Sequence, residues 1–141
     1  MRDSDNRLIA LLKANAREPV ASLARKLSLA RSTVQERIAR LEREGVIKGY
    51  TLLLSEESEA RRLRAVVMIA ADSRQADRIS AELKRMPEVR ALSAVSGAYD
   101  MMAIVEADSP ARMDAVLDRI GKASGVARTV SSIILSEKFS R

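Results

Sequence analysis

Hydrophobic residues in the first fifty positions recur at the three- and four-residue spacing of an α-helix. In "DSDNRLIALLKANAREP" we expect a first helix that Ser4 or Asp5 caps and that Pro19 ends. Proline ends helices because it lacks an N–H and disfavours a helical conformation in the residue before it. Four apolar side chains form the inward stripe of this helix: Leu8, Ile9, Leu11 and Leu12.

Two further helices are predicted before residue 46. The stretch "VASLARKLSL" predicts a short helix, and its inward positions are Val20, Leu23, Ala24 and Leu27. A break near Ser28 leads into "ARSTVQERIARLERE", which Gly45 ends as a C-terminal cap. Three helices, the last two joined by a tight turn, indicate a helix-turn-helix unit. The following "GVIKGYTLLL" predicts a β segment that leads away from that unit.

The rest of the chain alternates between strand and helix patterns. Residues 55–62, "SEESEARR", are charged and lack a core pattern. We then expect, in order, a strand over 63–71, a helix over 73–86 ended by Pro87, strands over 89–96 and 99–107 joined at Gly97-Ala98, a helix over 109–122 with Ser109 as N-cap and Pro110 at its first position, and a strand over 126–136. This βαββαβ order is that of a ferredoxin-like sandwich. The sequence thus predicts an α+β protein with a helix-turn-helix domain at 1–50, a linker at 51–62 and a ferredoxin-like domain at 63–141.

Both faces of the predicted sheet are apolar. Ala65, Val67 and Ile69 point to one face, and Val66, Met68 and Ala70 point to the other. Helices cover one face only, and monomers rarely leave a large apolar patch in water. We therefore expect the bare face to pack against a second copy and form a homodimer. The alternative is that the linker or the N-terminal domain covers this face within one chain.

Composition narrows the possible functions. The 141 residues include no Cys and no His, which excludes the usual structural zinc sites and any catalytic dyad that needs either residue. The longest apolar run, residues 65–71, is too short to cross a bilayer, so we expect a cytoplasmic protein without a membrane partner. We find no phosphate loop and no metal-ligand cluster, and therefore expect neither a cofactor nor an enzyme.

Positive charge is concentrated in the N-terminal third. Residues 1–50 carry 11 lysines and arginines against 6 acidic residues, whereas residues 51–141 carry 14 against 13. In the predicted third helix, Val34, Ile38 and Leu41 share one side, and short hydroxyls, Gln and Arg cover the rest. A helix in the major groove needs such groups for phosphates and base edges. The sequence therefore favours binding of double-stranded DNA, with an ordinary solvated surface helix as the alternative.

Two segments carry a family resemblance. "RLEREGVIKGY" and "SGAYD", in this order and separation, resemble the Lrp/AsnC (feast/famine) family of bacterial and archaeal transcription regulators, and the resemblance covers essentially the whole chain. It implies a winged-type helix-turn-helix joined to an effector domain that dimerises through its sheets and often assembles into tetramers or octamers. It further implies a transcriptional regulator that responds to a small molecule, commonly an amino acid. An effector-independent protein that structures the nucleoid is the alternative.

The resemblance also assigns candidate site residues. Carried over from the family, the DNA-contacting positions are Arg31, Ser32, Thr33, Gln35, Arg37 and Arg40. The family's effector pocket lies between dimers, near the Gly-x-Tyr-Asp turn and the last strand. It corresponds here to Gly97, Ala98, Tyr99 and Asp100, with Thr129, Ser131 and Ser132 opposite. Asp100 would meet the ammonium group of an amino acid and hydroxyl or N–H donors its carboxylate. The other interpretation of "GAYD" is a plain hairpin turn.

Two positions depart from the family pattern. Ser28 stands where the family usually has Gly in the helix-turn-helix turn, and Ala30 stands where it usually has a Ser N-cap. A lost N-cap costs about 1 kcal/mol, and a left-handed conformation disfavours residues other than Gly. We expect Ser28 or Ser32 to cap the helix from a shifted register.

Overall fold

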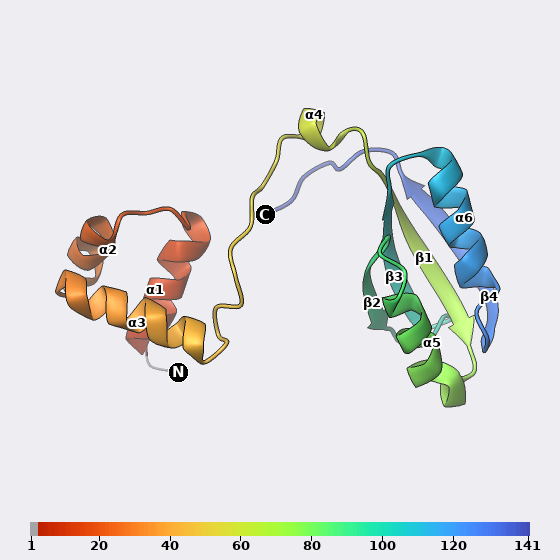
Figure 1. The fold of residues 1–141 in the computed structure, drawn as a ribbon, viewed down its shortest axis with the longest axis horizontal. Helices are drawn as coiled ribbons and strands as arrows, with labels where there is room; N and C mark the ends of the chain where they lie inside the picture. The colour runs from red at the N-terminus through yellow and green to blue at the C-terminus, as the bar shows by residue number, and fades with distance from the viewer. Residues whose placement is uncertain (1–2) are drawn as a thin grey trace. The chain divides into compact units, whose positions relative to one another are not determined.

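The computed structural model describes residues 3–141, with the side chain of residue 56 left aside (Figure 1). The chain forms two compact units, one ending at Leu53 and the other running from Leu54 to Arg141. The first unit contains three helices: α1 (Asp3–Ala14), α2 (Val20–Leu27) and α3 (Arg31–Arg43). Its core consists of the stripes expected from the sequence: Leu8, Leu12, Leu23, Ala24, Leu27, Val34 and Leu41. The three-helix prediction is confirmed.

The predicted ends of α1 are wrong. Ser4 and Asp5 lie inside the first turn of the helix, and Asp5 is buried instead of capping it. At the other end, α1 stops at Ala14, where the side chain of Asn15 accepts a hydrogen bond from the backbone N–H of Arg17 at 3.1 Å. A local turn by Asn15 therefore ends the helix before Pro19, which instead directly precedes α2.

The turn between α2 and α3 has the predicted strain. Ser28 adopts φ 55° and ψ 45°, a left-handed conformation that its Cβ disfavours. Ala30 occupies the N-cap of α3 and provides no side-chain hydrogen bond. The expectation that Ser28 or Ser32 caps α3 from a shifted register is therefore wrong. Gly45, with φ 71°, follows the end of α3 as predicted.

The β segment expected in "GVIKGYTLLL" does not form. Within residues 3–53 the structure contains no strand, so this extended segment has no neighbour in its own unit with which to form a ladder. Ile47 packs against the core of the unit, whereas Leu52 and Leu53 face solvent with 80% and 97% of their surface exposed. The sequence pattern of a strand is present, but the pairing partner that would stabilise it is not part of this unit.

The second unit confirms the βαββαβ order. Its strands are β1 (Leu63–Ala71), β2 (Val89–Ala94), β3 (Met101–Ala107) and β4 (Val126–Ile134), and its helices are α4 (Glu56–Glu59), α5 (Ala76–Lys84) and α6 (Pro110–Gly121). The sheet has the order β2-β3-β1-β4, and every neighbouring pair is antiparallel. Ser109 caps α6 by accepting a hydrogen bond from the N–H of Arg112 at 3.1 Å. The short α4 falls in the segment 51–62 that we expected to be a linker.

The sheet has one covered and one open face. Ala65, Val67 and Ile69 of β1 are buried in one core with side chains of α5 and α6. Figure 1 shows these two helices and the sheet that they accompany. On the open face, the register places Val66 beside Ile104 and Met68 beside Met102. These open-face side chains are only half-buried, so within residues 54–141 no helix covers them. The unit therefore has the unpartnered apolar face that the alternating pattern predicts.

No helix among residues 3–141 combines the length and apolar character needed to cross a bilayer.

Candidate DNA interface and ligand site

Helix α3 exposes a polar surface above a buried anchor. Val34 and Leu41 are almost completely buried and hold the helix against α1 and α2. On the other side, the side chains of Arg31, Ser32 and Gln35 are exposed. Because one side of α3 packs into the core and the other side exposes guanidinium, hydroxyl and amide groups, the helix can place these groups against phosphates and base edges.

Arg40 has a second partner inside the unit. Its Nη2 donates a hydrogen bond to Oδ1 of Asp5 at 2.9 Å, which ties α3 to α1. The Asp5 side chain is only 3% exposed, whereas that of Arg40 is 31% exposed. Sequence reasoning missed this pair, although Asp5 lies at helical spacing with Leu8 and Leu12 on the inward stripe. Part of the role of Arg40 is therefore structural.

Thr33 and Arg37 flank the buried stripe and are half-buried. The Nη1 atom of Arg37 is enclosed and has no hydrogen-bond partner among the described residues. Buried guanidinium nitrogens normally find an acceptor, so this group retains unused donor capacity at the edge of the exposed face of α3.

The turn between β2 and β3 is closely tied to the end of β1. Gly97 adopts φ 124°, which favours glycine. Oδ2 of Asp100 accepts a hydrogen bond from the backbone N–H of Ala71 at 2.8 Å, and the N–H of Asp100 donates to the carbonyl of Ile69 at 2.9 Å. The guanidinium of Arg128 lies 5.3 Å from the ring centre of Tyr99. Asp100 thus has a structural role, and Arg128 is a neighbour that sequence reasoning missed.

The three candidate hydroxyl residues on β4 are divided between the two faces. Thr129 pairs with Ile69 and Ser131 with Val67, so both belong to the face that α5 and α6 cover. Ser132 pairs with Val66 and therefore belongs to the open face. Thr129 and Asp100 both neighbour Ile69, but they lie on opposite sides of β1, because Asp100 adjoins β3 and Thr129 belongs to β4. The expectation that all three hydroxyls lie opposite the turn is too simple, since neighbouring residues of a strand point to opposite faces.

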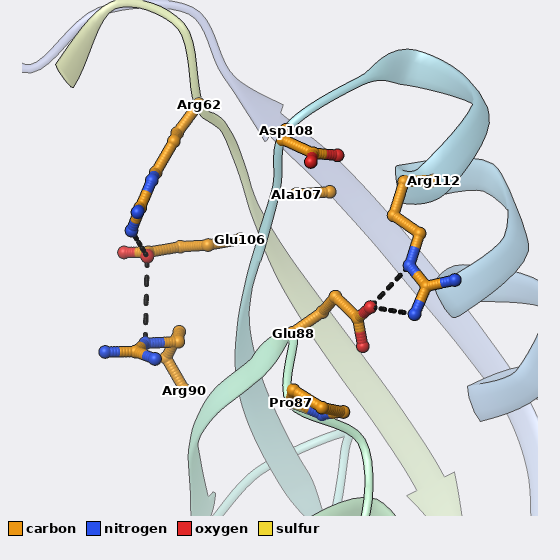
Figure 2. Close-up of a pocket in the computed structure, with 8 residues that line it drawn as sticks. All are labelled: Arg62, Pro87, Glu88, Arg90, Glu106, Ala107, Asp108 and Arg112. Atoms are coloured by element: carbon orange, nitrogen blue, oxygen red, sulfur yellow. Dashed lines mark hydrogen bonds and ion pairs between the residues drawn. The ribbon is translucent and has the colours of Figure 1, made fainter.

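A cavity of about 520 Å³ near the edge of the sheet is lined by charges that sequence reasoning did not group. Figure 2 shows the guanidinium of Arg112 against Glu88, and Glu106 between Arg62 and Arg90 at 3.8 and 3.7 Å. A hydrogen bond from its own backbone N–H and the bond from Arg112 hold the pKa of Glu88 below its usual value. These charges pair with each other, so the cluster is explained by structural ion pairing.

The described residues contain no group of three carboxylates that could hold a metal ion. Together, an exposed polar helix on a three-helix unit and a separate α+β unit define the class of two-domain, DNA-binding regulators. Two family models agree with this class: "Winged helix-turn-helix DNA-binding" matches residues 1–48, and "Lrp/AsnC ligand binding domain" matches residues 64–141.

Relatives along the full length agree. The transcriptional regulator LysM of Saccharolobus solfataricus is 31% identical, over 97% of this chain and 95% of its own length. The crystal structure of the leucine response regulatory protein LrpA of Mycobacterium tuberculosis is 33% identical and matches with a TM-score of 0.82, covering 99% of this chain and 96% of that one. The L-Met complex of the regulator NMB0573 from Neisseria meningitidis has the same fold, with a TM-score of 0.84 over 99% and 93% of the two chains, at 24% identity.

The chain therefore belongs to the Lrp/AsnC family and is a DNA-binding transcriptional regulator with a ligand-binding domain. Its curated relatives are named as helix-turn-helix regulators and not as enzymes, in agreement with the sequence prediction.

Proposed function

We propose that this regulator recognises specific DNA sites through the exposed face of α3. The main support is that buried Val34 and Leu41 hold α3 in the core, so that the exposed Arg31, Ser32 and Gln35 are free to enter the major groove of DNA. In this proposal Ser32 and Thr33 contact phosphates near the start of the helix. The amide of Gln35 reads a base edge, and a good bidentate contact of this kind is worth about 1–3 kcal/mol of discrimination.

Selection of operator sequences from a random duplex library tests this proposal. The parent should enrich a discrete motif, and Gln35→Ala should relax the preference at one position of each half-site. Glu36→Ala is the matched control, because Glu36 is a neighbouring exposed side chain of the wrong charge for phosphate contact. Uniform coverage without a motif would instead favour the alternative of a protein that structures the nucleoid without sequence preference.

We further propose that two chains pair through the open faces of their sheets. The half-buried apolar side chains on this face include Val66, Met68, Met102 and Ile104. A homodimer would present two α3 helices to major grooves about one turn, roughly 34 Å, apart or at a multiple of this spacing. Assembly into tetramers or octamers would build on this dimer.

Solution scattering of the parent and of Met68→Arg at micromolar concentration tests the pairing. A charge in the centre of the open face should leave the covered core intact and lower the mass to that of one chain. A parent mass of 15.5 kDa, that of a single chain, would refute the proposal.

We also propose that the effector is an amino acid bound near Gly97–Asp100. The support comes from the Asp100 carboxylate at this turn and from Arg128, whose guanidinium lies 5.3 Å from the ring centre of Tyr99, so that the turn region carries both charges that a zwitterion needs. The solved complex of NMB0573 with L-Met, in a regulator of the same fold, is consistent with this ligand class. Thr129 belongs to the covered face, whereas its neighbour Arg128 belongs to the open face, so the Thr129 hydroxyl is not part of this set.

Thermal unfolding in the presence of each of the twenty amino acids tests the effector. One or a few should raise the midpoint in the parent and fail to do so in Asp100→Asn. Asparagine keeps a side-chain oxygen to accept the bond from the N–H of Ala71 but loses the negative charge for the ammonium group. Asp108→Asn removes an exposed charge elsewhere in the unit and serves as the control. Stabilisation that is equal in both variants would place the ligand elsewhere.

A further inference from the structure

An open surface groove of about 510 Å³ between α5 and α6 is rich in positive charge. Its lining consists of five side chains: Arg78, Ala81, Glu82, Arg85 and Arg119. Three guanidinium groups therefore face one carboxylate, and none of the three arginines forms an ion pair with another described side chain. The cavity near Glu88 and Glu106 is the opposite case, because there the arginines are matched by carboxylates (Figure 2).

Helix electrostatics explains only part of this cluster. Arg85 and Arg119 lie at the C-terminal ends of α5 and α6, where the helix dipole favours positive charge. Arg78 lies in the first turn of α5, where the same dipole disfavours it. Glu82, one turn further along α5, is the one carboxylate among the five lining side chains, and it balances only one of the three guanidinium groups. With three guanidinium groups and one carboxylate, the lining carries a net positive charge that attracts an anion.

We propose that the groove between α5 and α6 is a binding site for a phosphoryl group carried by a phosphorylated small molecule. Guanidinium forks match the oxygens of phosphate in paired hydrogen bonds, and several of them can surround one dianion. The cavity volume lies in the range of small-molecule sites, and the small side chain of Ala81 keeps it open. This site lies wholly in the second unit and depends on neither the α3 interface nor the amino-acid site.

DNA backbone phosphates offer the same chemistry, so the experiment includes both sources. In the first arm, pyrophosphate is titrated into the full-length, DNA-free protein at constant ionic strength, and binding is followed by calorimetry. The parent should bind with saturation. Arg78→Gln/Arg85→Gln/Arg119→Gln should lower the affinity at least tenfold, because it removes the charge-assisted hydrogen bonds to the phosphoryl oxygens. Ala81→Leu should weaken binding by filling the groove without any change of charge.

The matched control is Arg74→Gln/Lys138→Gln/Arg141→Gln, which removes three exposed positive charges elsewhere in the unit. It should bind pyrophosphate like the parent. Equal loss in both triple variants, or no saturable binding by the parent, overturns a site for a small phosphorylated molecule. Circular dichroism of each variant verifies that the helices and strands are retained.

In the second arm, the salt dependence of DNA binding is compared for the parent and the arginine triple variant. An unchanged slope, with pyrophosphate binding lost, assigns the groove to a free phosphorylated ligand. A slope reduced by about 2–3 without pyrophosphate binding assigns its phosphoryl contact to the DNA backbone and overturns the small-molecule source. If the arginine triple variant changes neither the affinity for pyrophosphate nor the salt slope of DNA binding, the groove is not a phosphoryl site.

Discussion

Replacement of Arg40 by alanine tests the structural link between α3 and α1. The change removes the guanidinium that donates to Asp5 at 2.9 Å and leaves a carboxylate that is 3% exposed without this partner. Breaking a fully buried ion pair costs about 3–5 kcal/mol, and losing a hydrogen bond to a charged group costs about 1.5–3 kcal/mol. Because Arg40 is 31% exposed, water partly screens the pair. We therefore expect a loss of about 2–3 kcal/mol in the unfolding free energy of the first unit.

Urea unfolding followed by circular dichroism at 222 nm measures this loss. A small unit has an m value of about 1 kcal/mol/M, so the transition of the first unit should move down by about 2 M. Arg43→Ala is the matched control, since Arg43 pairs with Glu36 on the same helix at 3.2 Å but with side chains 63% and 71% exposed. This exposed pair should contribute less than about 1 kcal/mol.

Substitution of the other partner, Asp5, shows how much each side chain of the ion pair contributes to stability. Asp5→Ala should cost less than Arg40→Ala, because the half-exposed guanidinium can turn to water whereas the buried carboxylate cannot. In the double variant the two losses should not add. Equal midpoints for Arg40→Ala and Arg43→Ala would refute this account of the pair. The DNA affinity of Arg40→Ala has to be measured without urea, at a temperature at which the first unit of this variant remains folded.

Three further outcomes are expected in the same assay. Ala30→Ser should stabilise the first unit by about 1 kcal/mol by giving α3 an N-cap side chain, and an unchanged midpoint would contradict this. Gly125→Ala should destabilise the second unit by about 2 kcal/mol or more, because its φ is 94° and a Cβ would lie 2.5 Å from Cβ of Gln75. The pKa of Glu88 is lowered in the folded state, so the ionised side chain stabilises the fold at pH values above its unfolded pKa of 4.5. This stabilisation is lost as the pH falls through the folded pKa. Glu88→Gln should therefore weaken the dependence of the unfolding free energy on pH in this acid range.

Much of the fold could be predicted because apolar spacing alone determines it. The stripes at Leu8 and Leu12, the alternation along β1 and the Ser109-Pro110 start of α6 each depend on neighbours in sequence. The end of α1 was misplaced because a local turn at Asn15 ends the helix before Pro19 can. The strand expected around Tyr50 failed for another reason, since a strand pattern does not reveal whether a pairing partner exists.

The candidate sites were only partly predictable. Exposure of Ser32 and Gln35 follows from helical period, but the burial of Asp5 and its pairing with Arg40 depend on how α1 crosses α3. Register likewise decided that Ser131 and Ser132 belong to opposite faces. The arginine groove between α5 and α6 combines residues separated by more than thirty positions, and nothing in the linear sequence groups them.

The affinity of the parent and of Gln35→Ala for a selected operator, each divided by the affinity for a scrambled duplex, tests DNA recognition by α3 most directly. Gln35 is exposed and supports neither core, so both proteins should have the same stability. The account predicts a specificity ratio of about a thousand or more for the parent and a reduction of about tenfold or more in the variant. An identical ratio for the two proteins would contradict base recognition by this helix.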